Sequence, residues 1–274
     1  MTAATLDHAS SAPHRAPIAP HRGAGPLTAS RVFVGRSMRH SMRDGEGWLM
    51  AIVLPVMVML LFTVVFGGAI DAGGGHLAYV DFVVPGIIVL CSGFGASSVA
   101  VSVNRDVTGG AMQRFRSLPI TAAYCLVGHI VASLLRNLIA TAIVIGVAML
   151  MGFRPAAGPL DWALAAVLVL AWILAINVVF AAIGLLASSP EAANGYGFGL
   201  LFLPYLSSAF VPLHTLPDWL QPIAAGQPVT PLTDALRALL FAGDPGGQLW
   251  FALAWCGGII ALGAALIAWR FPRG

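Results

Sequence analysis

The chain has 274 residues, of which 58% are hydrophobic and only 9% are charged. An average globular domain carries about 25% charged residues, so this chain has too little polar surface for a soluble fold of its length and is expected to be an integral membrane protein. The fourteen basic residues are all Arg, and a standard P-loop is excluded because a Walker A loop needs a Lys to reach the nucleotide phosphates. We interpret the net charge of +3 as a signal of membrane topology, with no nucleic-acid partner.

The first 47 residues contain two different segments. Residues 1–25 are rich in Ala, Pro, Ser and His and have too few apolar residues to pack, which predicts a disordered cytoplasmic tail. Residues 26–47 have the pattern of an amphipathic helix in the inner membrane interface, with its basic side toward lipid headgroups. The alternative is that its Arg residues only anchor the first span. On a helical wheel the basic and apolar residues separate as Arg36, Arg39 and Arg43 against Val34, Met38 and Met42.

Six apolar segments follow within residues 48–273, and each is close to the roughly 20 residues that a membrane span needs. The predicted fold is therefore an all-α integral membrane protein with six transmembrane helices. The fifth segment is short and is interrupted by Pro204. The six segments are Trp48–Phe66, Phe82–Val103, Tyr124–Phe153, Trp162–Ala187, Tyr196–Leu213 and Leu249–Trp269.

The loop charges predict the orientation of these spans. If the spans alternate, most Arg residues fall on one side, whereas the opposite loops hold only Arg154 and Arg237 beside six Asp residues. By the positive-inside rule, both termini are expected to be cytoplasmic, in a multi-pass protein of the cell membrane. The Arg residues on the cytoplasmic side are Arg15, Arg22, Arg31, Arg36, Arg39, Arg43, Arg105, Arg114, Arg116, Arg270 and Arg273.

A short polar segment, Asn104–Ile120, separates the second and third apolar segments. A compact charged loop between two spans is well placed to receive a push from a cytoplasmic subunit. We therefore expect this loop to dock on a separate ATP-hydrolysing protein, although its charges are also explained by the positive-inside rule alone. The candidate coupling residues are Arg105, Asp106, Arg114 and Arg116.

Arg136 lies inside the third apolar segment, where an Arg at the bilayer centre costs at least about 2.5 kcal/mol. From Arg136 to Phe153 a helix rises roughly 25 Å, which nearly crosses the hydrocarbon. We therefore place Arg136 near the inner interface, with its side chain snorkelling and Thr121–Leu135 forming a helical extension at the cytoplasmic surface. The alternative is an Arg that faces the translocation path.

The external stretch His214–Asp244 is too polar and too rich in Pro to span a membrane. It is expected to form two short extracellular helices between spans five and six, one around Trp219 and one with Thr230–Pro231 as its N-cap and first residue. Asp234 and Arg237 have the spacing of a pair on one helix face, and we predict that this pair is exposed and contributes little stability.

Several polar or small residues fall within the spans. The possible path-lining residues are Ser97, Ser98, Ser102 and Asn177, for which helix packing is the alternative role. Gly195 and Gly199 have a spacing that allows close helix approach. Since no Asp or Glu lies inside a span, the energy for any transport is expected to come from outside the chain.

The sequence indicates neither a catalytic site nor a metal site. HExxH, GxSxG and EF-hand patterns are absent. Cys91, Cys125 and Cys256 lie far apart in or near apolar runs without a CxxC spacing, so they are expected to be buried free thiols.

Three stretches carry a family resemblance: RFRSLPI at Arg114–Ile120, GFRP at Gly152–Pro155 and, most specifically, Ser207–Leu240. With them, residues 26 to 273 resemble the ABC-2 type transporter permeases, and within these the daunorubicin-resistance permease group. The resemblance implies a separately encoded ABC ATPase, two permease copies or paralogues forming the path, and a coupling region at Arg105–Pro119. It also implies that ATP and Mg²⁺ bind to the partner and that this chain binds no cofactor.

The resemblance implies export of an amphiphilic compound such as a drug or antibiotic. A lipid or polysaccharide-precursor exporter of the same architecture is the close alternative. A non-transport membrane protein, such as an intramembrane enzyme or an assembly factor, is the alternative from a different class.

Overall fold

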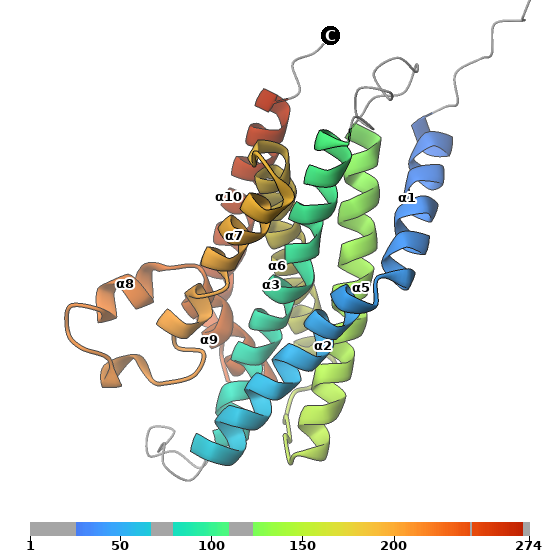
Figure 1. The fold of residues 1–274 in the computed structure, drawn as a ribbon. Helices are drawn as coiled ribbons and strands as arrows, with labels where there is room; N and C mark the ends of the chain where they lie inside the picture. Colours follow the sequence, from blue (N-terminus) through green and yellow to red (C-terminus); the bar gives the residue numbers. More distant parts are fainter. Residues whose placement is uncertain (1–25, 67–78, 110–122, 242, 271–274) are drawn as a thin grey trace, which may run out of the picture.

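The computed structural model describes residues 26–66, 79–109, 123–241 and 243–270, and these residues form a bundle of helices (Figure 1). The expected N-terminal tail, residues 1–25, lies outside them. The longer elements are α1 (Pro26–Arg43), α2 (Gly45–Leu60), α3 (Tyr79–Thr108), α5 (Ala123–Leu150), α6 (Pro159–Leu186), α7 (Pro190–Leu200), α9 (Val229–Leu240) and α10 (Gly246–Arg270). The shorter ones are η1 (Leu61–Phe66), η2 (Leu203–Leu206), η3 (Leu213–Thr215) and α8 (Gln221–Gly226).

Five helices of the described chain are long and apolar enough to cross a membrane. They coincide with five of the six predicted segments, so the prediction of an all-α membrane protein is confirmed, whereas a count of six is not. The five are Gly47–Val65, Tyr79–Thr108, Cys125–Leu150, Pro159–Leu186 and Gly246–Arg270.

The fifth predicted span, Tyr196–Leu213, is not one helix. Ser189 caps α7 by accepting a hydrogen bond from the backbone N–H of Ala192 at 3.1 Å, but the helix ends at Leu200. Three Gly residues with low helix propensity lie in its second half, and Pro204 follows. A short 3₁₀ turn and irregular backbone continue to residue 212, and this stretch leads from the end of the bundle where α6 ends toward the end where α10 begins (Figure 1).

Helix α3 is the centre of the bundle. Its most apolar window is 83% buried, against 17% for the windows of α2 and α10, which lie at the periphery. Close approach to α3 occurs at two glycines, since a Cβ on Gly184 would lie 2.4 Å from the Ala100 carbonyl oxygen and one on Gly86 would lie 2.6 Å from the Ala209 Cβ. The predicted packing role of Gly195 and Gly199 is wrong for the described chain, because nothing lies within 4 Å of a Cβ at either position.

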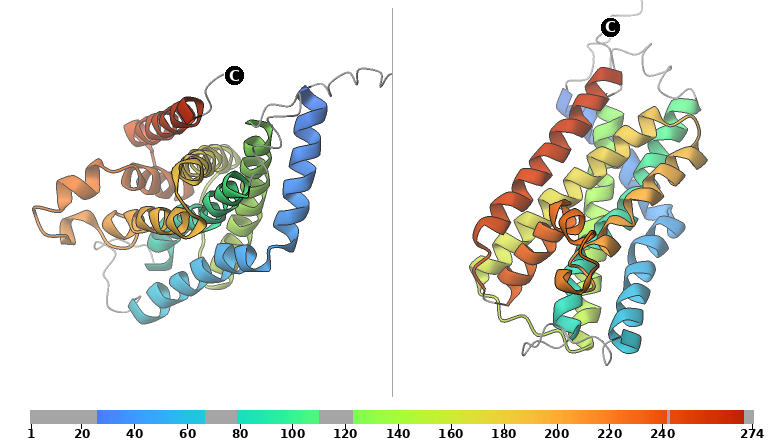
Figure 2. Two further views of the ribbon diagram at one scale, coloured as in Figure 1. Left: turned by 45° about the horizontal axis from the view of Figure 1, so that its top comes forward. Right: turned by 90° about the vertical axis from the view of Figure 1, so that its left-hand side faces the viewer.

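Helices α1 and α2 meet beside the middle of α5 (Figure 1). The expected N-terminal helix exists, but it ends at Arg43 rather than at residue 47, because Asp44 begins a new helix by accepting a hydrogen bond from the Gly47 N–H at 3.0 Å. The N-terminal end of α1 lies at the same end of the bundle as the C-terminal end of α10, where α3 ends and α5 begins (Figures 1 and 2).

The two short helices predicted between spans five and six correspond to α8 and α9. The start predicted for the second was wrong by about two residues: α9 begins at Val229, with Pro228 before it. Thr230 is not the N-cap, because its hydroxyl donates to the Ala224 carbonyl. Nine of the twelve residues of α9 are buried, so this helix is an integral part of the bundle.

Candidate functional site

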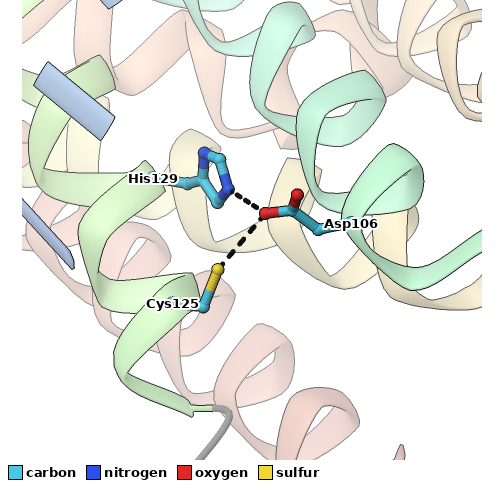
Figure 3. A group of neighbouring side chains, drawn as sticks. All are labelled: Asp106, Cys125 and His129. Carbon is cyan, nitrogen blue, oxygen red and sulfur yellow. Dashed lines mark hydrogen bonds and ion pairs between the residues drawn. The ribbon is translucent and has the colours of Figure 1, made fainter. Parts of the chain in front are cut away.

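Asp106, Cys125 and His129 meet where α3 ends and α5 begins (Figure 3). His129 Nε2 lies 2.8 Å from Asp106 Oδ2, and the Cys125 thiol donates a hydrogen bond to the same oxygen at 3.2 Å. Cys125 and His129 are four residues apart on α5, so both side chains lie on one face of the helix. Asp106 lies four residues before residue 110 and Cys125 lies three after residue 122, so these contacts close the base of the predicted coupling loop.

Arg36 extends the group to a third helix. Its guanidinium lies 3.7 Å from Asp106 Oδ1, the oxygen that faces away from Cys125 and His129. We call Arg36, Asp106, Cys125 and His129 the loop-base cluster. The side chains of Asp106 and His129 are only 16% and 13% exposed, so their contact is screened less by water than a surface pair, whereas the Arg36 side chain is 53% exposed. The cluster therefore fixes α1, α3 and α5 to one another at one end of the bundle.

The four predicted coupling residues have different positions. Arg105 is exposed, whereas its neighbour Asp106 points inward to the loop-base cluster. Arg114 and Arg116 lie outside the described residues. A role in coupling stays a prediction for all four, and the structure adds that Asp106 is placed to hold the loop ends rather than to contact a partner.

The predicted interfacial helix uses an unexpected face. Arg39 and Arg43 are exposed, but the residues buried against the bundle are Ser37 and Ser41, and α1 packs along α5. Met42, expected on the apolar side, is 72% exposed. Small seryl side chains allow close approach of two helices, which accounts for this choice of contact face.

Arg136 is buried in the middle of α5 and does not snorkel. Its side chain is 4% exposed and forms an ion pair with Asp44 at 3.2 Å. It also donates hydrogen bonds to the Gly95 carbonyl at 2.8 Å and to the hydroxyls of Ser98 and Ser41. The expected depth near the inner interface stays a prediction. Arg136 lies level with the start of α2, and its two terminal nitrogens are bound by Ser41, Asp44 and α3 instead of solvent, whereas its buried Nε has no partner among the described residues. We call these five residues the Arg136 cluster.

The four predicted path-lining residues lie in different surroundings within the described chain. Ser98 and Ser102 line a polar pocket of about 20 Å³ beside Arg136 and His129, which is room for one water molecule. Ser97 donates to the Phe94 carbonyl, and Asn177 is fully buried on α6, where its amide donates to the Ile173 carbonyl. Their role in lining a path stays a prediction.

Arg237 also differs from its predicted environment. Its pairing with Asp234 is present at 2.8 Å, but the guanidinium also donates to the carbonyls of Phe82 and Ser208, each at 3.0 Å, and lies 4.0 Å from the Phe82 ring centroid. Its side chain is 16% exposed. Burial lowers the pKa of Arg237, and the Asp234 carboxylate acts in the opposite direction and keeps the group charged.

These bonds explain how the broken fifth segment is tolerated. Irregular backbone at membrane depth needs protein partners for its polar groups. Besides Arg237, Asp234 accepts a hydrogen bond from the Ser208 hydroxyl at 2.7 Å, and Thr230 accepts one from the Ser208 N–H at 3.3 Å. All four residues lie within Ser207–Leu240, the stretch with the most specific family resemblance.

An apolar cavity of about 130 Å³ lies beside this irregular segment. Its walls come from α3, α6, the end of α7 and α10. They include Trp172, Phe180, Leu201, Pro204 and Ile259. The break in the fifth segment thus leaves a space that an apolar group can enter.

Comparison with known proteins decides the family. The sequence model of the ABC-2 type transporter family matches residues 28–241. The chain belongs to the ABC-2 type transporter family. The match covers most of α1, the loop-base cluster, the Arg136 cluster and α9, so each of these features lies within the matched region.

Two of the relatives of this ABC-2 type protein have names that refer to drug resistance. It is 29% identical over 216 residues to the daunorubicin resistance ABC transporter permease protein DrrB1 of Streptomyces coeruleorubidus. This alignment covers 78% of this chain and 76% of the relative. It is 27% identical over 273 residues to the probable doxorubicin resistance ABC transporter permease protein DrrC of Mycobacterium tuberculosis. This alignment covers 93% of this chain and 95% of the relative. The resemblance to daunorubicin-resistance permeases is therefore confirmed.

The grouping of His129 with Cys125 was not predicted from the sequence. The signal was present as a Cys–x₃–His spacing on a predicted helix, but the third member, Asp106, comes from another helix. The Arg136–Asp44 pair was missed for the same reason, since its members are 92 positions apart.

Proposed function

We propose that this chain is the membrane subunit of an ABC exporter, which moves an amphiphilic compound such as a drug or antibiotic outward across the cell membrane. The observation that carries the proposal is the family match over residues 28–241, together with relatives named as drug-resistance permeases. ATP and Mg²⁺ bind to a separate ABC ATPase subunit. The absence of Lys from the whole sequence supports this division, because a Walker A loop needs one.

The loop-base cluster can transmit a conformational change of the ATPase to the membrane helices. A force on residues 107–124 acts first on their two ends, which Asp106 joins to Cys125 and His129. From there it reaches α3, the central helix, and also α1 through Arg36. The Arg-rich charge of this end of the bundle supports its assignment to the cytoplasm, with both termini on that side and α1 at the membrane interface.

The apolar cavity and the peripheral helices suit a path for an amphiphile. The cavity beside Pro204 accepts an apolar group, and we assign α8 and α9, which lie in the half of the bundle away from the loop-base cluster (Figure 1), to the extracellular side. The poorly buried windows of α2 and α10 are available to lipid or to a second permease copy or paralogue. Part of a lipid chain is an apolar group of the same kind, so a lipid exporter is the second candidate.

Co-purification of this chain with a co-expressed ABC ATPase from the same genome tests the proposal. We expect a stable complex in detergent whose ATP hydrolysis is stimulated by daunorubicin. Stimulation by lipid or a lipid-linked glycan, with no response to daunorubicin, would select the second candidate. If no ABC ATPase associates with the folded chain, the transport proposal is wrong.

A further inference from the structure

We propose that Asp106, Cys125 and His129 form a binding site for a divalent transition metal of the zinc class. A carboxylate, a thiolate and an imidazole are the three donor types that Zn²⁺ takes in proteins. The donor atoms of the three side chains all lie within 4.8 Å of one another. This departs from the expectation that the chain has no metal site, and it does not depend on the proposed transport function.

The geometry is close to that of a tetrahedral site. With metal bonds of about 2.0–2.3 Å, the donor atoms of a tetrahedral zinc site lie about 3.3–3.7 Å apart. The present contacts to Asp106 Oδ2 measure 2.8 and 3.2 Å, so each lengthens by less than about 1 Å around an ion. The distance between the Cys125 and His129 donor atoms, which is within 4.8 Å, adjusts to the same range. Rotation of the side chains provides this without movement of the helices, because Cys125 and His129 already project from the same face of α5 (Figure 3).

The residues around the three donors orient the carboxylate, and the donors themselves limit the charge of the site. Arg36 faces Asp106 Oδ1, which leaves Oδ2 for the ion and orients the carboxylate. On binding, the Cys125 thiol releases its proton to solvent as the sulphur–metal bond forms, and His129 offers the lone pair of Nε2. The two anionic donors then offset the 2+ charge. The polar pocket that includes His129 and Ser102 can supply water as the fourth ligand.

A bound ion would clamp the base of the loop. Asp106 precedes residues 107–124 and Cys125 follows them, so one metal ion bound to both residues joins the two ends of this segment by coordinate bonds. The hydrogen bonds now present hold the same groups more weakly. Metal occupancy would therefore set how rigidly the ends of α3 and α5 move together.

Titration of the purified full-length permease with Co²⁺ in detergent tests the site. We expect one Co²⁺ per chain, visible d–d bands of a tetrahedral ion and a near-ultraviolet sulphur-to-cobalt charge-transfer band, all removed when Zn²⁺ is added. Cys125→Ser should lose the charge-transfer band and bind Co²⁺ at least tenfold more weakly. The matched controls are Cys91→Ser and Cys256→Ser, which remove buried thiols from α3 and α10, and both should keep the bands.

The variant Cys125→Ser could fail to fold, so a second test uses the double variant Cys91→Ser with Cys256→Ser, in which Cys125 is unchanged. It retains Cys125 as its sole thiol, so a charge-transfer band can come from that residue alone. The proposal is contradicted if this folded variant shows no such band at saturating Co²⁺, in which case the cluster is held by hydrogen bonds and ion pairs only. It is also contradicted if folded Cys125→Ser keeps the wild-type spectrum.

Discussion

The guanidinium of Arg136 lies 3.2 Å from the carboxylate of Asp44, so one ion pair joins the middle of α5 to the junction of α1 and α2. Arg136 is almost fully buried, whereas the Asp44 side chain is 30% exposed. The pair thus holds the junction between α1, which packs along α5, and α2, which begins the first membrane span.

Asp44→Asn is expected to destabilise the protein, because it leaves the buried Arg136 charge without its anion. Breaking a fully buried pair costs about 3–5 kcal/mol, and since Asp44 is partly exposed we expect about 2 kcal/mol. That corresponds to a decrease of roughly 4–8 °C in the melting temperature measured in detergent. Asp218→Asn, at an exposed carboxylate outside the bundle, is the control and should melt like the wild type. An unchanged melting temperature for Asp44→Asn would show that water compensates Arg136.

Arg237→Ala is expected to lower both protein level and melting temperature. It removes the donor to two backbone carbonyls, Phe82 and Ser208, and a buried acceptor without a partner costs about 1–3 kcal/mol. Arg237→Lys keeps the charge but cannot reach both carbonyls with a planar fork, so an intermediate effect is expected. The exposed Arg39→Ala provides the matched loss of an Arg. Wild-type stability of Arg237→Ala would restore the prediction of an exposed, weak pair.

Two glycines distinguish close helix packing from helix propensity. Gly184→Ala brings a Cβ to 2.4 Å from the Ala100 carbonyl, whereas a Cβ on Gly257 of α10 meets nothing within 4 Å. Overpacking costs about 1–3 kcal/mol, so Gly184→Ala should melt at a lower temperature. Gly257→Ala should be neutral or slightly stabilised, since Ala favours a helix over Gly. Equal melting temperatures of the two variants would mean that α3 and α6 are packed less tightly than in the structure.

Reporter fusions test the orientation and the broken fifth segment together. A reporter after Gly274 is expected to be cytoplasmic and one inserted near Gly74 external, because the Arg-rich loops share one side. Four long helices, α3, α5, α6 and α10, lie between these two sites. Opposite locations of the reporters need an odd number of crossings, so the segment from α7 to residue 212 must then cross the membrane as well. Detection of both reporters on the same side would show that it does not cross.

The positions of most membrane helices could be predicted from the sequence, whereas the contacts between the helices could not. Long apolar runs predict spans such as Pro159–Leu186 directly, because length and hydropathy alone determine membrane insertion. The Asp234–Arg237 pair was also predictable, since its spacing of three is local to one helix. Its burial was not, because that depends on Phe82 and Ser208, which lie on segments far away along the chain.

The candidate site followed the same division. The loop between α3 and α5 was identified from its charges, but Asp106 and its neighbour Arg105 could not be assigned different roles without the direction in which each side chain points. The Cys125–His129 spacing was visible in the sequence and gained meaning only when α3 brought Asp106 to it. Local patterns thus predicted the elements, and pairings between helices decided the chemistry.

ATP-driven uptake of daunorubicin into inside-out vesicles containing the permease and its ABC ATPase tests the central claim most directly. The two decisive variants are Arg114→Ala with Arg116→Ala and Arg114→Lys with Arg116→Lys. Alanine removes the charges that would set the register of docking, whereas lysine keeps the positive-inside charge but loses the planar guanidinium. We predict that wild-type vesicles accumulate the drug and that the Ala variant inserts at normal levels but loses most of its uptake, with the Lys variant also impaired. Wild-type uptake by the Lys variant, together with loss of the Ala variant from the membrane, would contradict docking through this loop and leave topology as the reason for its charges.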